Sequence, residues 1–232
     1  MRKFIAAILF AGLFIISGYA QKTRRASTSV KHAAAVKTAP RPSLDPGAIS
    51  GRTYTNKSLD FSVTFPDTWL LPDNDFEKYM KSQGVDISLK VPAGLSRQTT
   101  ARLKQSTQKV TVLVTGYKFL PGLDENAIIR VSAENLSSTP QIKDAVDYID
   151  AMRQTLRGIV LPGFKYSETK AEKLGSMQFA YIDTETKDDK RRLYATVRDG
   201  YAVLFSISYT QDEDVEVLRG LLSEGDFKLN RS

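Results

Sequence analysis

The residue types that most often perform nucleophilic or acid–base catalysis are nearly missing from this sequence. It contains no Cys and a single His, His32, which lies in a polar N-terminal stretch where we assign it no role. Thiol nucleophiles, thiolate zinc sites and His-containing triads are therefore excluded from the folded part. No phosphate-binding glycine loop, nucleophile elbow or zinc-protease motif occurs either. We predict no catalytic residue, no metal ligand and no cofactor.

Paired carboxylates and a Ser–Lys dyad are the catalytic chemistry that remains. Asp147 and Asp150 stand one helical turn apart, but solvated pairs of this kind are common, and we favour a structural role for them. The triplet Asp73-Asn74-Asp75 begins like a calcium loop, yet the Gly and the distal Glu of such a loop are not at the required spacing. A helix cap explains this triplet better.

A stretch without acidic residues, 87–123, offers a different chemistry, the binding of an anionic group or of a partner. Arg97, Arg102 and Lys104 lie in its polar part, residues 94–108, where they could form a partner-binding edge. The alternative is a solvated loop without a partner. Both interpretations are kept.

The net charge of +7 is unevenly distributed along the chain. Residues 1–58 contain 10 Lys or Arg and 1 Asp, a net +9, whereas residues 59–232 contain 23 Lys or Arg and 25 Asp or Glu, a net −2. A globular nucleic-acid-binding domain carries its positive charge on the fold itself, so no nucleic-acid partner is predicted. The basic stretch could be weakly attracted to a membrane surface or an anionic envelope component, or could serve solubility alone.

The N-terminus has the three parts of a secretory signal peptide. Arg2 and Lys3 precede an apolar run over residues 4–16, and the small residues Gly18 and Ala20 then occupy positions −3 and −1 of a cut between Ala20 and Gln21. This predicts a signal peptide at residues 1–20 and an extracytoplasmic location, periplasmic or secreted. The alternative is an uncleaved N-terminal anchor, for which the apolar run is short.

Residues 21–52 are predicted to form a disordered basic linker. They contain no aromatic residue, six Ala, three Pro, and seven Lys or Arg against one Asp. A segment of this composition cannot bury enough apolar surface to order itself. The folded domain is therefore expected to span residues 53–232, and without disulfides its core alone must stabilise it.

The stretch Leu59 to Trp69 predicts the opening strand of this domain. Its apolar residues alternate with polar ones up to Phe65, which is the period of a strand with one buried face. Pro66 cannot continue a ladder and ends the strand. The only Trp of the chain, Trp69, should fold back over the same face.

The remaining elements follow from periodicity and turn signals. Helices are expected at residues 76–82, from a start at Ser138-Thr139-Pro140 to Gly158, and from a capping box at Thr210 to Gly225. Strands are expected at residues 53–56, 86–91, 110–115, 127–134, 164–173, 176–186, 190–198 and 201–209.

The dipeptide Asp199-Gly200 between two alternating runs is a strong hairpin signal. A two-residue loop there predicts that Tyr194 faces Phe205 and that Ala195 faces Leu204. The last strand carries apolar residues on both sides, so it needs a covering layer on each. The predicted fold class is α+β, an α-β-α sandwich around a central antiparallel sheet with helices on both faces.

The pattern Tyr54, Asn56, Leu59-Asp60-Phe61-Ser62-Val63, Phe65-Pro66 and Trp69 resembles the opening of PsbP-like domains. This family is named for an extrinsic subunit of the photosynthetic oxygen-evolving complex, and its fold also occurs in a Ran-binding protein of the Mog type and in uncharacterised bacterial exported proteins. The resemblance covers about residues 53–230 in element order. It implies an α-β-α sandwich and a non-catalytic binding or assembly role. Because the domain lacks His, the resemblance implies neither the metal site nor the photosystem partner of the photosynthetic members.

Three functions are left open by the sequence. The first is an exported, non-enzymatic binding or accessory module of the cell envelope whose partner is a protein or an anionic envelope component. The second is an extracytoplasmic enzyme of unrecognised type, such as a hydrolase. The third is a membrane-surface protein held by an uncleaved N-terminal helix.

Overall fold

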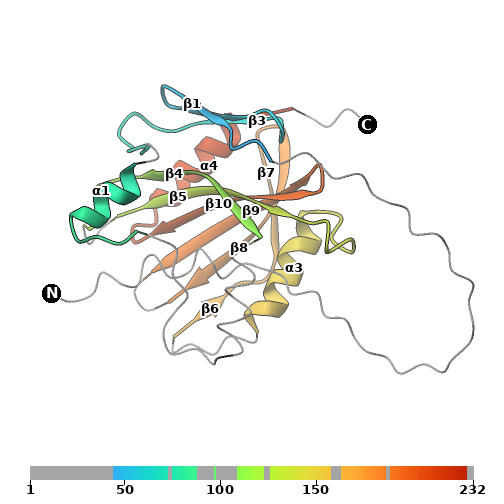
Figure 1. The fold of residues 1–232 in the computed structure, drawn as a ribbon. Coiled ribbons are helices and arrows are strands. Elements are labelled where there is room, and N and C mark those ends of the chain that lie inside the picture. The colour runs from blue at the N-terminus through green and yellow to red at the C-terminus, as the bar shows by residue number, and fades with distance from the viewer. Residues whose placement is uncertain are drawn as a thin grey trace, which may run out of the picture.

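A computed structural model describes residues 44–72, 75–87, 97, 109–122, 126–157, 163–186 and 189–228 of the 232-residue chain. In this part of the chain, two antiparallel sheets and three helices make up the regular structure (Figure 1). The helices are α1 (Phe76–Ser82), α3 (Ala145–Leu156) and α4 (Asp214–Glu224). The predicted α+β class is confirmed.

The larger sheet has seven strands in the order β4-β5-β10-β9-β8-β6, with β7 also paired to β8. They are β4 (Val110–Tyr117), β5 (Ile128–Asn135), β6 (Lys165–Tyr166), β7 (Lys170–Leu174), β8 (Met177–Glu185), β9 (Lys190–Arg198) and β10 (Tyr201–Tyr209). The predicted strands at 164–173 and 176–186 correspond to β6, β7 and β8. The prediction at 86–91 falls mostly outside the described residues.

A smaller sheet, which the sequence analysis did not predict as a separate layer, has the order β1-β2-β3-β11. Its strands are β1 (Ala48–Ser50), β2 (Thr53–Asn56), β3 (Phe61–Thr64) and β11 (Asp226–Phe227). The prediction of a single central sheet was therefore incomplete.

The position of β1 corrects the predicted domain boundary, because β1 lies inside the predicted linker, residues 21–52. The Tyr54 hydroxyl donates to the Pro46 carbonyl at 2.8 Å, and the buried Asn56 amide donates to the Asp45 carbonyl at 2.8 Å. These bonds and the packing of Leu44 on the core hold the segment. The average composition of the 32 residues 21–52 did not indicate that the C-terminal end of this segment is ordered.

The opening strand is confirmed by its burial. Leu59, Phe61, Val63 and Phe65 are each at most 3% exposed, and Trp69 is also 3% exposed. The guanidinium of Arg52 donates to the carbonyls of Pro66 and Trp69, which fixes the return of the chain after the strand.

The β9–β10 hairpin has the predicted register throughout. Tyr194 pairs with Phe205 and Ala195 pairs with Leu204. Asp199 and Gly200 have φ angles of 48° and 78°, the left-handed conformations that a two-residue turn of this type requires.

Alternate residues of the larger sheet belong to two different cores. On β10, Phe205 belongs to the core that contains the buried residues of α4 and of the smaller sheet, and Leu204 belongs to the core that contains those of α3. Helix α4 contacts β10, β7 and β3, so it touches both sheets (Figure 1). Helix α3 contacts β8 and β9. The central strands are therefore apolar on both faces, because each face packs against a different layer.

Two helix starts differ from the sequence prediction. Helix α3 does not begin at Ser138-Thr139-Pro140, which form a turn; it begins after Asp144, whose carboxylate accepts the Asp147 N–H at 2.9 Å. The carboxylate of Asp147 accepts the Lys143 N–H at 3.0 Å, which completes a reciprocal cap.

The predicted capping box of α4 at Thr210 is wrong as well. Helix α4 begins after Glu213, and no side chain caps it. A tight turn in which the Asp214 N–H donates to the Gln211 carbonyl precedes the helix. In both cases a good capping residue lies in a turn just before the helix.

Strand β4 also departs from simple alternation. The register with β5 shifts between Val112 and Val114, which leaves Val112 40% exposed and Val114 buried. Such a bulge adds one residue to the strand and turns the following side chains to the other face. Among the described residues, no helix is both long and apolar enough to cross a membrane.

The close approach of Gly116 on β4 to the ring of Phe65, the residue after β3, generates a stability prediction. A Cβ added at Gly116 would lie 2.6 Å from the Phe65 ring, which is 1% exposed. We expect Gly116→Ala to lower the free energy of unfolding by about 1–3 kcal/mol, because the buried ring has nowhere to move. Gly220 in α4 has no heavy atom within 4 Å of an added Cβ. The control Gly220→Ala should therefore raise stability, by up to about 1 kcal/mol.

Denaturant unfolding followed by the fluorescence of the single Trp69 measures both variants. Equal stability of the two variants would contradict the close packing of Gly116 against the Phe65 ring.

Candidate docking surface

Of the three residues predicted to bind a partner, the structure describes only Arg97, which is helical and exposed. Arg102 and Lys104 lie outside the described residues, as do Ala20 and Gln21 at the predicted signal-peptide cut. Their roles stay predictions.

The carboxylates of α3 have local partners. Asp147 belongs to the helix cap. Asp150 accepts the hydroxyl of Thr169 and lies 3.6 Å from the Arg153 guanidinium. These contacts tie α3 to the segment before β7, in agreement with the structural role that we favoured for the pair.

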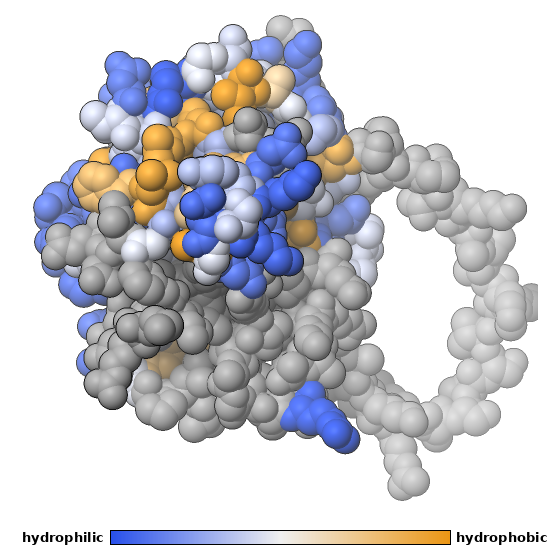
Figure 2. Space-filling model, turned by 60° about the vertical axis from the view of Figure 1, so that its left-hand side comes forward, coloured by the Kyte–Doolittle hydropathy of each residue, from blue (hydrophilic) through white to orange (hydrophobic). Residues whose placement is uncertain are grey.

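Four large apolar or aromatic side chains are exposed near the end of β4, and we call them the apolar band. They are Leu70 at 38%, Tyr79 at 56%, Phe119 at 43% and Leu120 at 52% exposure. Figure 2 shows apolar residues gathered between hydrophilic ones on this side of the molecule. An exposed apolar cluster with a polar rim is typical of an interaction site.

The apolar band is assembled from three separate segments around Tyr117. Leu70 and Tyr117 exchange backbone hydrogen bonds of 2.7 and 2.9 Å, which places Leu70 beside the end of β4. From α1, the Phe76 ring lies 5.6 Å from the Tyr117 ring and 6.5 Å from the Tyr79 ring.

The loop that carries Phe119 and Leu120 is held by the side chain of Asn126. Its Oδ1 accepts the Phe119 N–H at 3.0 Å, and its Nδ2 donates to the carbonyls of Phe119 at 2.8 Å and Leu120 at 3.4 Å. Lys118 bonds the nearly buried carboxylate of Asp214 at 2.8 Å. The loop therefore presents two apolar side chains on a fastened backbone.

These residues were not predicted as a binding surface, although the sequence contains a signal for them. Phe119 and Leu120 are consecutive large apolar residues directly before the Pro121-Gly122 turn. A strand with one buried face alternates, so two neighbours of this kind at a strand end cannot both point into the same core.

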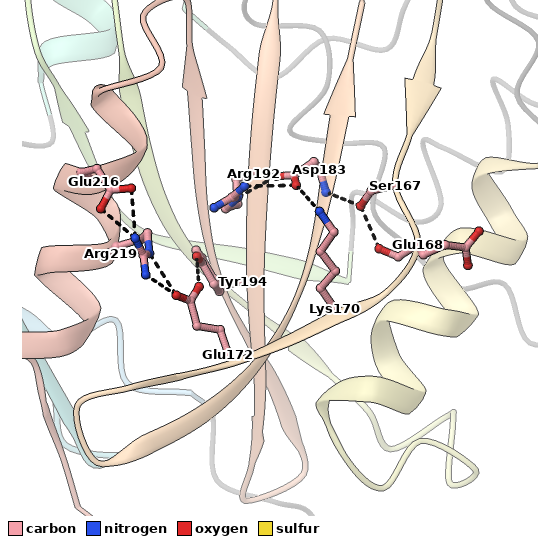
Figure 3. A network of polar contacts seen from close by, with 9 residues as sticks. All are labelled: Ser167, Glu168, Lys170, Glu172, Asp183, Arg192, Tyr194, Glu216 and Arg219. Atoms are coloured by element: carbon pink, nitrogen blue, oxygen red, sulfur yellow. Dashed lines mark hydrogen bonds and ion pairs between the residues drawn. The ribbon is translucent and has the colours of Figure 1, made fainter.

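A charge-paired network lies on strands β7, β8 and β9 of the larger sheet and on α4, away from β4 (Figure 3). Glu172 on β7 accepts the Tyr194 hydroxyl at 2.7 Å and the Arg219 Nε–H at 3.1 Å. Arg219 also contacts Glu216 on α4 at 2.8 Å. Although partial burial raises the pKa of Glu172, the bonds from Tyr194 and Arg219 outweigh it and lower this pKa below its usual value. The network thus fastens α4 to β7 and β9.

A second part of the network joins β8 and β9. Asp183 contacts two nitrogens of Arg192 at 2.6 and 3.1 Å and Lys170 at 3.4 Å. The Arg192 guanidinium also lies 4.7 Å from the Tyr181 ring centre. Acidic and basic groups alternate along the network, and we assign it a structural role.

Glu134 on β5 is a buried carboxyl with an unusual proton affinity. It is 2% exposed and accepts the hydroxyl of Tyr148 on α3 at 2.7 Å. Burial raises its pKa to about 7, although the Tyr148 hydrogen bond and the charge of Lys109 act in the opposite direction. Burial likewise raises the pKa of Asp189 to about 6, against the pull of Arg191.

A shallow hollow of about 100 Å³ lies beside β3, and its charged residues are Lys57, Asp60, Asp226 and Lys228. The two positive and two negative charges of these residues cancel. No group of three or more His, Cys, Asp or Glu in the described part of the chain is arranged to hold a metal ion.

No model of a protein family and no curated protein sequence matches the chain. Solved structures with a similar fold include LpqN of Mycobacterium tuberculosis, described as involved in cell envelope biogenesis. It is 12% identical, the match covers 78% of this chain and 84% of LpqN, and the TM-score is 0.39.

Cyanobacterial PsbP (CyanoP) from Synechocystis sp. PCC 6803 is also similar, with 14% identity, coverage of 82% and 100%, and a TM-score of 0.41. A protein from Bacteroides thetaiotaomicron is 12% identical with a TM-score of 0.37, and the match covers 79% of this chain and 51% of that one. The solved structures similar to this chain thus include a PsbP domain, the family that its sequence resembles.

The buried pair Glu134–Tyr148 generates a prediction about pH. Folding raises the pKa of Glu134 from 4.5 to about 7, so folding favours its protonated form. Its contribution to stability is therefore complete below pH 4.5 and is lost as the pH rises through 7. By proton linkage the loss is about 3 kcal/mol. Glu134→Gln should remove this pH dependence, which denaturant unfolding at several pH values between 4 and 8 measures as the difference between variant and parent.

The matched control is Glu224→Gln, at an exposed residue near the end of α4, which should leave the profile unchanged. A Glu134→Gln profile parallel to that of the parent would show that folding does not raise the pKa of Glu134.

Proposed function

We propose that the chain is a non-enzymatic binding or accessory module of the cell envelope that docks on its partner through the apolar band. The observation that carries the proposal is the fastened loop after β4, which holds Phe119 and Leu120 about half exposed. Exposing large apolar side chains on an ordered loop is unfavourable in the free protein. An interaction that covers them explains why the loop is built this way.

We infer that the module is exported by a signal peptide at residues 1–20, cut between Ala20 and Gln21, and that a basic linker precedes the domain. The six Lys or Arg and the lack of acidic residues in residues 21–43, which remain after the cut, support an anionic envelope as its surroundings. We also infer that the larger sheet is the middle layer of an α-β-α sandwich. The alternate burial of Leu204 and Phe205 in the cores of α3 and α4 supports this arrangement.

A binding role accounts for the polar groups better than hydrolysis does. A hydrolase needs a nucleophile and a base that converge on one cleft. In the described part of the chain, Glu172, Asp183 and Asp214 are each paired with a cation, and Glu134 is paired with a tyrosine hydroxyl. The polar groups thus fasten elements to one another.

The proposal predicts that the apolar band is needed for docking but not for folding. We expect the double variant Phe119→Ser/Leu120→Ser to lose envelope crosslinks that the parent forms, while its unfolding free energy stays within about 1 kcal/mol of the parent, because both side chains are exposed. Chemical crosslinking in isolated envelopes measures the loss, and Trp69 fluorescence checks the fold. The control is Val146→Ser, at a residue that is 43% exposed on α3. Unchanged crosslinks in the double variant would refute the proposal.

The fastening of the loop makes a separate prediction. Asn126→Ala keeps both apolar side chains but removes three hydrogen bonds. If docking uses the fixed geometry, this variant should crosslink more weakly than the parent, since the loop must then be ordered on binding. Crosslinking of Asn126→Ala at the parent level would show that the side chains suffice without the fastening.

A further inference from the structure

A row of polar side chains crosses three neighbouring strands of the larger sheet. The register places Arg130 of β5 between Thr115 of β4 and Ser206 of β10 (Figure 1). Ser206 is two residues from Leu204, so this row lies on the face whose β8 and β9 part packs against α3. Tyr117, two residues after Thr115, lies on the same face. Arg130 is thus placed beside the core of α3, where it is partly exposed.

Arg130 is a partly buried cation without a carboxylate partner among the described residues. Its Nε–H donates to the Thr115 hydroxyl at 3.5 Å, and the Tyr117 hydroxyl is the other group that favours its charge. Burial lowers the pKa of Arg130, and no carboxylate in the described part of the chain counteracts this effect. Neutral hydroxyls alone compensate the charge, which is unfavourable for a cation that is partly withdrawn from water.

Three carboxylates on neighbouring elements do not act as the partner of Arg130. Asp189 lies 3.2 Å from Arg191, and its pKa is influenced by that residue. Glu134 shares the face of β5 but lies four residues further along, about 13 Å away, and it is bonded to a tyrosine of α3. Glu77 is exposed on α1 and influences the pKa of the neighbouring tyrosine of β4.

A second guanidinium raises the positive potential on this face. Arg191 on β9 donates from Nε to the Ser208 hydroxyl of β10 at 2.8 Å. Burial lowers the pKa of Arg191 to about 10, and the charge of Arg130 acts in the same direction, against Asp189. The two cations therefore repel each other across β10, whose Ser206 and Ser208 lie between them. An anion bound over these serines would relieve the repulsion.

We propose that this row is a binding site for an oxyanion, a carboxylate or phosphate group, which pairs with the Arg130 guanidinium above β10. A planar guanidinium presents a fork of N–H donors that matches two oxygens of such a group. The hydroxyls of Thr115, Tyr117 and Ser206 can donate beside it. This site is additional to docking through the apolar band and does not depend on the proposed function.

A structural role for Arg130 is the alternative, and the other arginines of the chain argue against it. Among the described residues, structural arginines bond a carboxylate, as Arg192 does with Asp183, or two backbone carbonyls, as Arg52 does after the opening strand. Arg130 reaches a hydroxyl of the adjacent strand β4, which the backbone ladder already holds. Its charge is therefore available to a ligand.

The unfolding of the full chain by urea, followed by Trp69 fluorescence, tests the site in sodium phosphate and in sodium acetate, each against sodium chloride at the same ionic strength. We expect phosphate, acetate or both to raise the unfolding midpoint in a manner that follows a binding curve, because a ligand bound only by the folded protein stabilises it. Phosphate also stabilises proteins by exclusion from their surfaces. That effect is shared by all variants, so the comparison between variants isolates binding.

Arg130→Met removes the cation and keeps a side chain of similar length. It should raise the apparent Kd for the oxyanion about tenfold or more, as expected for the loss of a charged hydrogen-bond partner. Its midpoint in chloride should stay at or above that of the parent, because an uncompensated cation is removed. The matched control Arg192→Met removes an arginine that is paired with Asp183. It should lower the midpoint in chloride but keep the oxyanion dependence of the parent.

A second variant, Arg130→Lys, keeps a positive charge without the planar fork and should bind the oxyanion more weakly than the parent. An oxyanion dependence that is equal in parent, Arg130→Met and Arg130→Lys, or that is missing from the parent, would overturn the inference. A chloride midpoint of Arg130→Met as low as that of Arg192→Met would overturn it as well, since Arg130 would then be structural. The proposed function is tested separately, by the crosslinking of Phe119→Ser/Leu120→Ser.

Discussion

Strand β10 is the element on which the arrangement of both cores depends. It pairs with β5 on one edge and with β9 on the other, and its apolar residues are buried on both faces. Phe205 serves one core and Leu204 the other. A slip of one residue would exchange the two faces and place Phe205 where a leucine fits. The Asp199–Gly200 turn fixes the register against β9 and so determines which residues meet α3 and which meet α4.

The same alternation places the charged groups at the end of the sheet. Asp183 and Arg192 are direct partners across β8 and β9, so their side chains share a face and pair. The next residue, Arg191, points to the opposite face, where it bonds the Ser208 hydroxyl at 2.8 Å and lies 3.2 Å from Asp189. Register thus determines both which apolar groups pack and which charges meet. This explains why adjacent arginines have separate acidic partners.

Features set by local pattern were predictable from the sequence, and features set by contacts between distant segments were not. The hairpin register and the buried face of Leu59 to Phe65 follow from alternation and from one turn, and the structure confirms both. The start of α3 was predicted too early, because Thr139 looks like a cap but its hydroxyl bonds the Leu136 carbonyl, at 3.2 Å, in a turn. Strand β1 was missed because it is held by Tyr54 and Asn56 of the next strand, which no composition argument for residues 21–52 could include.

The apolar band illustrates this limit most directly. A residue is exposed when no other element covers it, and the sequence alone does not show where the covering helices and sheets end. Leu70 is exposed because its backbone pairs with Tyr117 at the margin of the sheet, and Phe119 and Leu120 are exposed because Asn126 closes the loop that bears them. Neither of these contacts contributes apolar burial, yet together they fix where apolar surface is presented. In the proposed function, folding stability and docking therefore depend on different residues: the cores around β10 stabilise the domain, while a few polar contacts at its margin shape the proposed docking surface.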